Sequence, residues 1–326
     1  MTFRFSNYLM ALLLTPAAAS AAVPSVAVDI PPVYSLVDRV MGDLGSPNLL
    51  IQQGASPHRY SMRPSEAGAL DRADAVFWVS EALTPWLTHS LETLGDDAVS
   101  VQLMEVPGTR KLEYRQGVTF EQHDHGHDDH DHDHDHDHDH DAGHGHAHSH
   151  EGMNPHGWLD PVNARIWLGA IAESLATLDP EHADRYRENA RLGKADLEAL
   201  TDTLETQLAE DHETRFIVFH DAYQYFESRF GISAAGAISL GDARKPSPAR
   251  IEELRDLVDA LNIDCVFSEP QYNPALVESV FGDTGVDTSV VIDPLGTDLP
   301  LDDELYPQLL RQLADGVVHC GRASRG

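Results

Sequence analysis

Short runs of apolar residues alternate along the first part of the chain with segments that have helical spacing. The strand-like runs are Val26–Ile30, Leu49–Ile51 and Ala75–Val79, and the helical segments that follow them are Pro31–Met41, Pro64–Leu70 and Pro85–Leu94. Thr84 is the expected N-cap of the last of these helices, with Pro85 in its first turn. Strands that alternate with helices predict a parallel sheet covered by helices.

The same alternation returns in the last third of the chain. Its strand-like runs are Phe216–Phe219, Cys265–Phe267 and Ser289–Ile292, and its helical segments are Ala222–Phe230, Arg250–Leu261, Pro274–Phe281 and Glu304–Val318. Two helical patterns lie before it, at Pro161–Leu178 and from about His182 to Glu210. The second would be roughly 40 Å long at 1.5 Å per residue, which is long enough to join two lobes.

These patterns predict an α/β fold made of two doubly wound lobes with mostly parallel sheets. We place the first lobe at residues 23–180, a linking helix at 181–210 and the second lobe at 211–326. A segment at 121–151 inside the first lobe fits neither pattern. Its residues 123–150 contain 13 histidines and nine aspartates but no Lys or Arg. Such a composition predicts a disordered loop that binds divalent metal weakly, although a merely solubilising insertion would look the same.

Composition narrows the function classes and the compartment. The 326 residues carry a formal net charge of −32, which argues against nucleic acid or an anionic membrane surface as the main partner. Residues 1–22 have the features of a cleaved signal peptide, namely Arg4, the apolar run Tyr8–Leu14 and small residues before the cleavage point. No cysteine lies there to carry a lipid. In an exported chain the only two cysteines, Cys265 and Cys320, suggest one disulfide.

Four residues outside the His-rich segment form a candidate metal site. His58 and His220 come just after strand-like runs, Asp293 follows the run that ends at Ile292, and His156 lies before the helix that starts at Pro161. Ligands of open α/β sheets bind outside the carboxyl ends of the strands. Three imidazoles and one carboxylate are a suitable ligand set for four-coordinate Zn²⁺.

Five motifs give the chain a resemblance to a known family. They are Gly54–Ser65 (GASPHRYSMRPS), Asn154–Pro161 (NPHGWLDP), Phe219–Phe226 (FHDAYQYF), Phe267–Gln271 (FSEPQ) and Asp293–Gly296 (DPLG). In this order the chain resembles the metal-binding receptors of zinc- and manganese-uptake ABC transporters, and among them the periplasmic zinc receptors. The resemblance implies two α/β lobes joined by a long rigid helix, with the metal in the cleft between the lobes. It also implies a His-rich loop and a Cys265–Cys320 disulfide.

The resemblance assigns roles to individual residues. His58, His156 and His220 match the three His ligands of the family, and the imidazole of His220 favours zinc because manganese-binding relatives often carry Glu there. Asp293 matches the carboxylate that completes the site in several relatives. Some zinc receptors instead have a Glu before the first ligand His, where this chain has Pro57. The fourth ligand is therefore expected to be Asp293, with water as the alternative.

These observations predict a monomeric periplasmic protein that captures Zn²⁺ and delivers it to the permease of an ABC transporter, without catalysing a reaction. Three alternatives remain at this point. The protein could be a receptor for manganese or another divalent metal, or a periplasmic metal buffer or chaperone that works without a transporter. It could also be a zinc hydrolase, although the chain has no HExxH motif because His150-Glu151 is not followed by His at Asn154.

Overall fold

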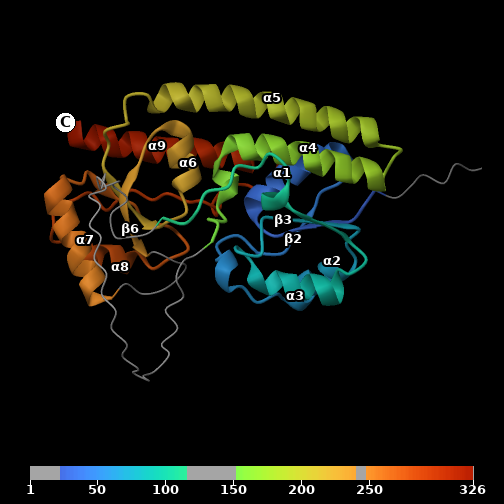
Figure 1. The fold of residues 1–326 in the computed structure, drawn as a ribbon, viewed down its shortest axis with the longest axis horizontal. Helices are drawn as coiled ribbons and strands as arrows, with labels where there is room; N and C mark the ends of the chain where they lie inside the picture. The colour runs from blue at the N-terminus through green and yellow to red at the C-terminus, as the bar shows by residue number, and fades with distance from the viewer. Residues whose placement is uncertain (1–22, 116–151, 240–246, 326) are drawn as a thin grey trace, which may run out of the picture.

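The computed structural model describes residues 23–115, 152–239 and 247–325. The predicted signal peptide 1–22 and the predicted loop 121–151 lie outside these residues. The described residues form two lobes, each built around a parallel sheet (Figure 1). Within the described part, no helix combines the length and the apolar composition needed to cross a bilayer.

The first lobe has a four-stranded parallel sheet in the order β2-β1-β3-β4. Its strands are β1 (Val26–Val28), β2 (Asn48–Leu49), β3 (Ala75–Trp78) and β4 (Val99–Gln102). Helices α1 (Pro31–Met41) and α4 (Pro161–Leu178) cover one face, and α2 (Pro64–Asp71) and α3 (Pro85–Leu94) cover the other (Figure 1). Short 3-10 helices lie at Gly42–Leu44, Pro57–Arg59, Leu103–Glu105 and Gly157–Leu159.

The second lobe has a three-stranded parallel sheet in the order β6-β5-β7. Its strands are β5 (Phe216–His220), β6 (Ala234–Ser239) and β7 (Cys265–Val266), and its helices are α6 (Gln224–Phe230), α7 (Pro248–Leu261), α8 (Pro274–Phe281) and α9 (Leu305–Arg325). Alternate residues of β5 enter different hydrophobic clusters, because successive side chains of a strand point to opposite faces.

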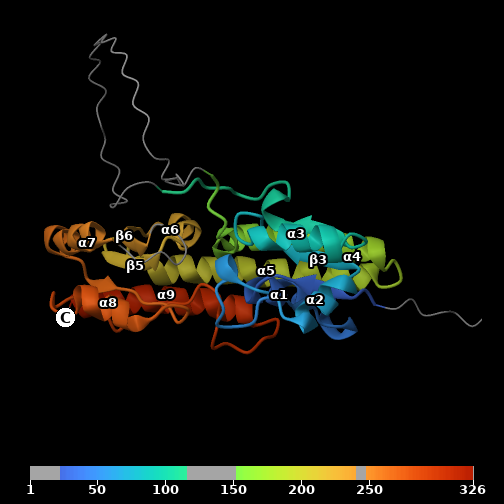
Figure 2. The same cartoon turned by 90° about the horizontal axis from the view of Figure 1, so that it is seen from below.

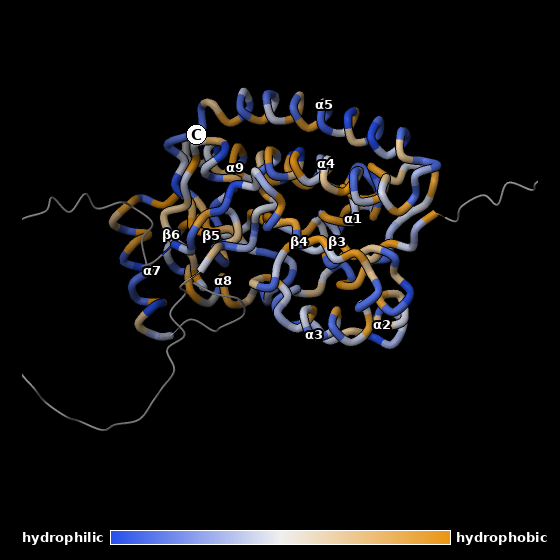
Figure 3. Tube along the Cα trace, turned by 45° about the vertical axis from the view of Figure 1, so that its right-hand side comes forward, coloured by the Kyte–Doolittle hydropathy of each residue, from blue (hydrophilic) through white to orange (hydrophobic). Residues whose placement is uncertain are grey.

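The 26-residue helix α5 (Ala183–Leu208) runs along both lobes and packs against α1, α4, α6 and α9 (Figures 1 and 2). Its apolar residues recur at helical spacing and face the helices beneath it, whereas its outer side is hydrophilic (Figure 3). Helix α9 also packs against α1 of the first lobe. One hydrophobic cluster therefore extends through both lobes, which opposes large movements of one lobe against the other.

Two local predictions differ from the structure, and two strands were missed. Thr84 makes no side-chain capping hydrogen bond to α3; its hydroxyl instead donates to the Ser80 carbonyl at 3.3 Å. The strands β4 and β6 were not predicted: β4 is partly exposed, and β6 consists mainly of Ala and Gly, which have low strand propensity. The predicted strand at 289–292 forms only an isolated bridge between Val291 and Ser268.

The Asp29 carboxyl, just after β1, is a buried titratable group that is not among the predicted ligands. It accepts hydrogen bonds from the backbone N–H groups of Ile30 and Val79, both at 2.8 Å. Burial nevertheless raises the pKa of Asp29 from 3.8 to about 7. Because the pKa is higher in the folded state, the folded protein holds the Asp29 proton more tightly than the unfolded chain does. The contribution of this protonation to the free energy of unfolding is complete below pH 3.8 and is lost as the pH rises through about 7.

An Asp29→Asn variant is therefore expected to change the pH dependence of stability. Between pH 5 and pH 8, wild type should lose about 2 to 3 kcal/mol of unfolding free energy relative to the variant. Urea unfolding of both metal-free proteins at the two pH values measures this difference, and the constant effect of the substitution cancels. Parallel pH profiles would contradict the prediction.

Candidate metal centre

Three histidines from distant parts of the sequence meet between the two lobes. His58 lies in the 3-10 helix Pro57–Arg59, His156 precedes the 3-10 helix Gly157–Leu159, and His220 is the last residue of β5. Each offers one ring nitrogen, and the three ligand atoms lie within 4.8 Å of one another. The structure thus brings together all three histidines that the sequence singled out.

The three rings face a small cavity and are packed by aromatic side chains. Their centroids are 5.3 Å apart for His156 and His220, 5.5 Å for His58 and His156, and 6.5 Å for His58 and His220. His156 and His220 are 2% and 5% exposed, and the Trp158 ring lies 5.1 Å from His156. The cavity has a volume of about 10 Å³, which is room for one water-sized sphere.

Asn154 fixes the orientation and the protonation of the His156 ring. Asn154 Oδ1 accepts a hydrogen bond from the His156 backbone N–H at 3.0 Å and lies 2.7 Å from His156 Nδ1. A backbone N–H can only donate, so this oxygen is an acceptor and Nδ1 carries the proton. The Nε2 atom of His156 is therefore the nitrogen that has its lone pair for a metal.

Glu269 has the same role for His220. Its Oε1 atom lies 2.8 Å from His220 Nδ1 and also accepts from the His220 backbone N–H at 3.3 Å. Glu269 is 2% exposed, and it follows β7, the strand that pairs with β5. A carboxylate behind a ligand imidazole fixes the tautomer and makes the imidazole a better donor to the metal.

Asp293 lies outside the group of three histidines, which contains no carboxylate among the described residues. Its Oδ1 atom accepts from Gln271 Nε2 at 2.6 Å and from the Leu295 backbone N–H at 2.9 Å, and its Oδ2 atom accepts from the Thr297 backbone N–H. These bonds tie the carboxylate to its own loop and to Gln271. Coordination by Asp293 therefore stays a prediction.

Two features that support the site were not assigned a role from the sequence. Asn154 stands two residues before His156, a spacing at which Asn side chains commonly bond to the backbone, so a local signal was present. Glu269 lies 49 residues from His220 and could be assigned only after β7 and β5 were placed side by side. The Cys265–Cys320 disulfide suggested by the sequence is present, with a Cα–Cα distance of 5.8 Å.

Comparison with known proteins identifies the family of the chain. A family described as the zinc-uptake complex component A, periplasmic, matches residues 26–320. The high-affinity zinc uptake system protein ZnuA of Brucella abortus (strain 2308) is 44% identical over 304 residues, which cover 90% of this chain and 91% of that protein. The protein of the same name from Paracoccus denitrificans (strain Pd 1222) is 43% identical over 320 residues, 97% and 98% of the two chains.

A solved structure supports the fold independently. The crystal structure of a ZnuA protein matches with a TM-score of 0.73 at 23% identity, and the match covers 92% of this chain and 99% of that chain. At this identity the likeness bears on the fold alone, which is the predicted pair of α/β lobes with parallel sheets. This likeness in fold is consistent with the family match over residues 26–320 and with the 44% identity to the Brucella abortus protein. The chain belongs to the ZnuA family of periplasmic zinc-uptake components.

Proposed function

We propose that this protein captures Zn²⁺ in the periplasm through His58, His156 and His220 and delivers it to the permease of a zinc-uptake ABC transporter. The observation that carries the proposal is the convergence of three imidazole nitrogens within 4.8 Å of one another. The relatives at 43% and 44% identity are named as high-affinity zinc uptake proteins, which supports transport over storage as the purpose of the site.

The ligand chemistry supports zinc as the cargo. Neutral imidazole is a preferred ligand of Zn²⁺, whereas Mn²⁺ prefers carboxylate and water oxygens. The His156 and His220 rings are each held by a second residue, so two of the nitrogens are oriented before a metal binds. We propose that Asp293 completes the tetrahedral site by turning out of its loop, with water as the alternative fourth ligand.

The size of the cavity favours a receptor over the hydrolase alternative. A hydrolase of this ligand type needs an open metal position and room for an organic substrate. The cavity of about 10 Å³ next to the histidines has room for an ion or a water molecule. Family membership points the same way, because the relatives are named as uptake proteins.

A metal titration of the purified, metal-stripped protein tests the proposal. The full chain and a chain lacking 121–151 are each titrated with Zn²⁺ and with Mn²⁺ against a competing chelator. We expect one tight zinc site in both proteins, weaker manganese binding, and additional weak zinc sites only in the full chain. Those weak sites would assign the His-rich segment an auxiliary role in collecting zinc.

Two outcomes would contradict the proposal in different ways. Tight binding that disappears with residues 121–151 would place the main site in the His-rich segment and favour a metal buffer. Manganese that binds as tightly as zinc would favour a general divalent-metal receptor. Delivery to the permease is tested separately, by asking whether the His156→Ala protein still supports zinc uptake by cells that lack the wild-type receptor.

A further inference from the structure

A strand-like segment of the first lobe lies against the second lobe next to the metal centre. Residues 112–115 pair with residues 152–154 through a hydrogen bond from the Tyr114 N–H to the Gly152 carbonyl at 3.1 Å and another from the Asn154 N–H to the Leu112 carbonyl at 2.8 Å. The Leu112 N–H also donates to the hydroxyl of Tyr225 on α6 at 2.9 Å. In this antiparallel pairing Leu112 lies opposite Asn154, the residue that orients His156, and Arg115 follows three residues further along the segment.

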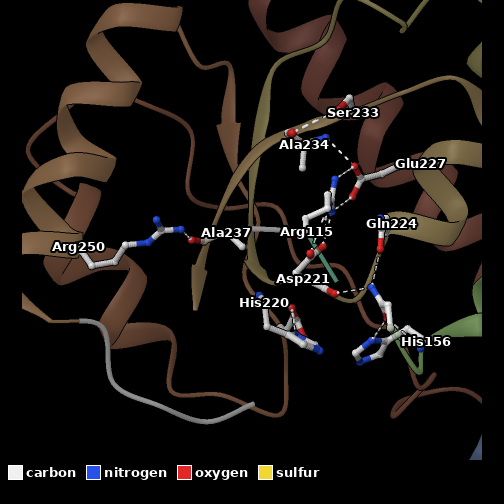
Figure 4. A network of polar contacts seen from close by, with 12 residues as sticks. Arg115, His156, His220, Asp221, Gln224, Glu227, Ser233, Ala234, Ala237 and Arg250 are labelled. Atoms are coloured by element: carbon white, nitrogen blue, oxygen red, sulfur yellow. Dashed lines mark hydrogen bonds and ion pairs between the residues drawn. The ribbon is translucent and has the colours of Figure 1, made fainter. Parts of the chain in front are cut away.

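The Arg115 guanidinium enters a buried ionic cluster in the second lobe (Figure 4). Its Nη1 and Nη2 atoms donate to the two carboxylate oxygens of Glu227, at 2.7 and 3.0 Å. Its Nε and Nη2 atoms donate to Asp221, the Nε atom at 3.1 Å. The Arg115 side chain is 16% exposed, and both carboxylates are 4% exposed. One arginine of the first lobe thus holds two acids of the second.

A continuous path of contacts leads from this cluster to both buried ligands. Asp221 directly follows His220 in the chain. The Asp221 carbonyl accepts a hydrogen bond from Asn154 Nδ2 at 3.3 Å, and the Oδ1 atom of the same Asn154 side chain holds His156 Nδ1 at 2.7 Å. Gln224 Oε1 accepts a second bond from Asn154 Nδ2 at 2.9 Å. His156 and His220, which come from different lobes, are therefore tied to one cluster.

We propose that Arg115 is a positioning residue of the metal centre: by holding Asp221 and Glu227 against the first lobe, it sets the spacing between His156 and His220. The inference rests on the proposed function, because it concerns the same zinc site. Tetrahedral Zn²⁺ needs ligand nitrogens about 3.3 Å apart, given Zn–N distances of about 2.0–2.1 Å. A shift of one lobe against the other would change this spacing and weaken the preference for a tetrahedral metal.

The planar fork of arginine is important to this role. It bonds two carboxylates in fixed directions, which a lysine ammonium cannot reproduce. Arg115→Gln removes both the charge and the fork, whereas Arg115→Lys keeps the charge that neutralises the buried acids. The lysine variant is therefore tested as well, in case the unneutralised acids prevent the glutamine variant from folding.

The experiment compares zinc affinity and the visible spectrum of bound Co²⁺, whose d–d bands report tetrahedral coordination. Arg115→Gln is expected to weaken zinc binding by about tenfold or more, as changes outside the ligand shell commonly do, and to alter the Co²⁺ bands. Arg115→Lys should show a smaller loss with altered bands. The matched control is Arg229→Gln, which removes another ion pair between the lobes, to Asp160 at 2.8 Å.

Arg229 acts through Asp160 instead of through Asp221 and Asn154, so its variant is expected to keep the wild-type Co²⁺ spectrum. Wild-type affinity and spectrum in Arg115→Gln, or in Arg115→Lys if the glutamine variant does not fold, would overturn the inference and leave the zinc site intact. Weaker zinc binding and altered Co²⁺ bands in Arg229→Gln would overturn the inference too, because the loss of any ion pair between the lobes would then disturb the site. A wild-type protein without tight zinc binding would refute the proposed function itself, and the inference with it.

Discussion

A His156→Ala variant is expected to bind Zn²⁺ on the order of 1000-fold more weakly than wild type, since even the loss of a residue behind a ligand commonly costs 10–100-fold. His156 is the most buried of the three imidazoles, and its Nδ1 proton is held by Asn154. Alanine would remove one of the three proposed ligands and leave the other two with a cavity that admits water. Competition titration with a zinc chelator measures the loss directly.

A second readout separates lost coordination from misfolding. Zinc should raise the melting temperature of wild type, because a ligand that binds only the folded state stabilises it by mass action, and it should leave that of His156→Ala nearly unchanged. His89→Ala is the matched control, since His89 is an exposed histidine of α3 near Glu92. If His156→Ala kept wild-type affinity, or if His89→Ala lost it, the assignment of the centre would be wrong.

The helices could be located from the sequence because their starting signals are local. Proline stands in the first turn of α1, α2, α3, α4, α7 and α8, where its missing N–H has no structural consequence. Strands with long apolar side chains, such as Phe216–Phe219, were found in the same way. Strand β6 was not predicted, because its small residues give no strand signal of their own and it is buried by pairing with the neighbouring β5. The bounds of the two lobes as domains stay predictions.

The sequence singled out the three histidines that the structure brings together, but it assigned no role to the residues that hold their rings. His220 is the last residue of β5, a strand-end position that the sequence reveals. His58 and His156 lie in or next to 3-10 helices, and the sequence singled them out by their places after a strand-like run and before the helix that starts at Pro161. Asn154 lies only two residues from His156, but other contacts in and around the centre join residues far apart in the chain, such as Glu269 to His220 and Arg115 to Asp221, which are 49 and 106 residues apart. These long-range contacts depend on how the sheets and lobes pack, so no local pattern in the sequence predicts them.

Removing the disulfide is expected to lower the free energy of unfolding by about 4 kcal/mol, which is the chain-entropy value for a loop of this length. The bridge joins β7 to α9 across a sequence separation of 55 residues, and both cysteines are fully buried. We expect a Cys265→Ser/Cys320→Ser double variant to unfold at a clearly lower urea concentration than wild type. Both proteins are measured metal-free, so that zinc binding does not mask the difference.

The same variant tests whether the bridge serves stability alone. β7 leads to Glu269, which orients His220, but β7 is also held by β5 through parallel pairing. Zinc stoichiometry should therefore stay at one tight site, even though the fold is weaker. Reductant should lower the stability of wild type toward that of the double variant and leave the variant unchanged. A double variant as stable as wild type would show that α9 and the shared core hold β7 in place without the bridge.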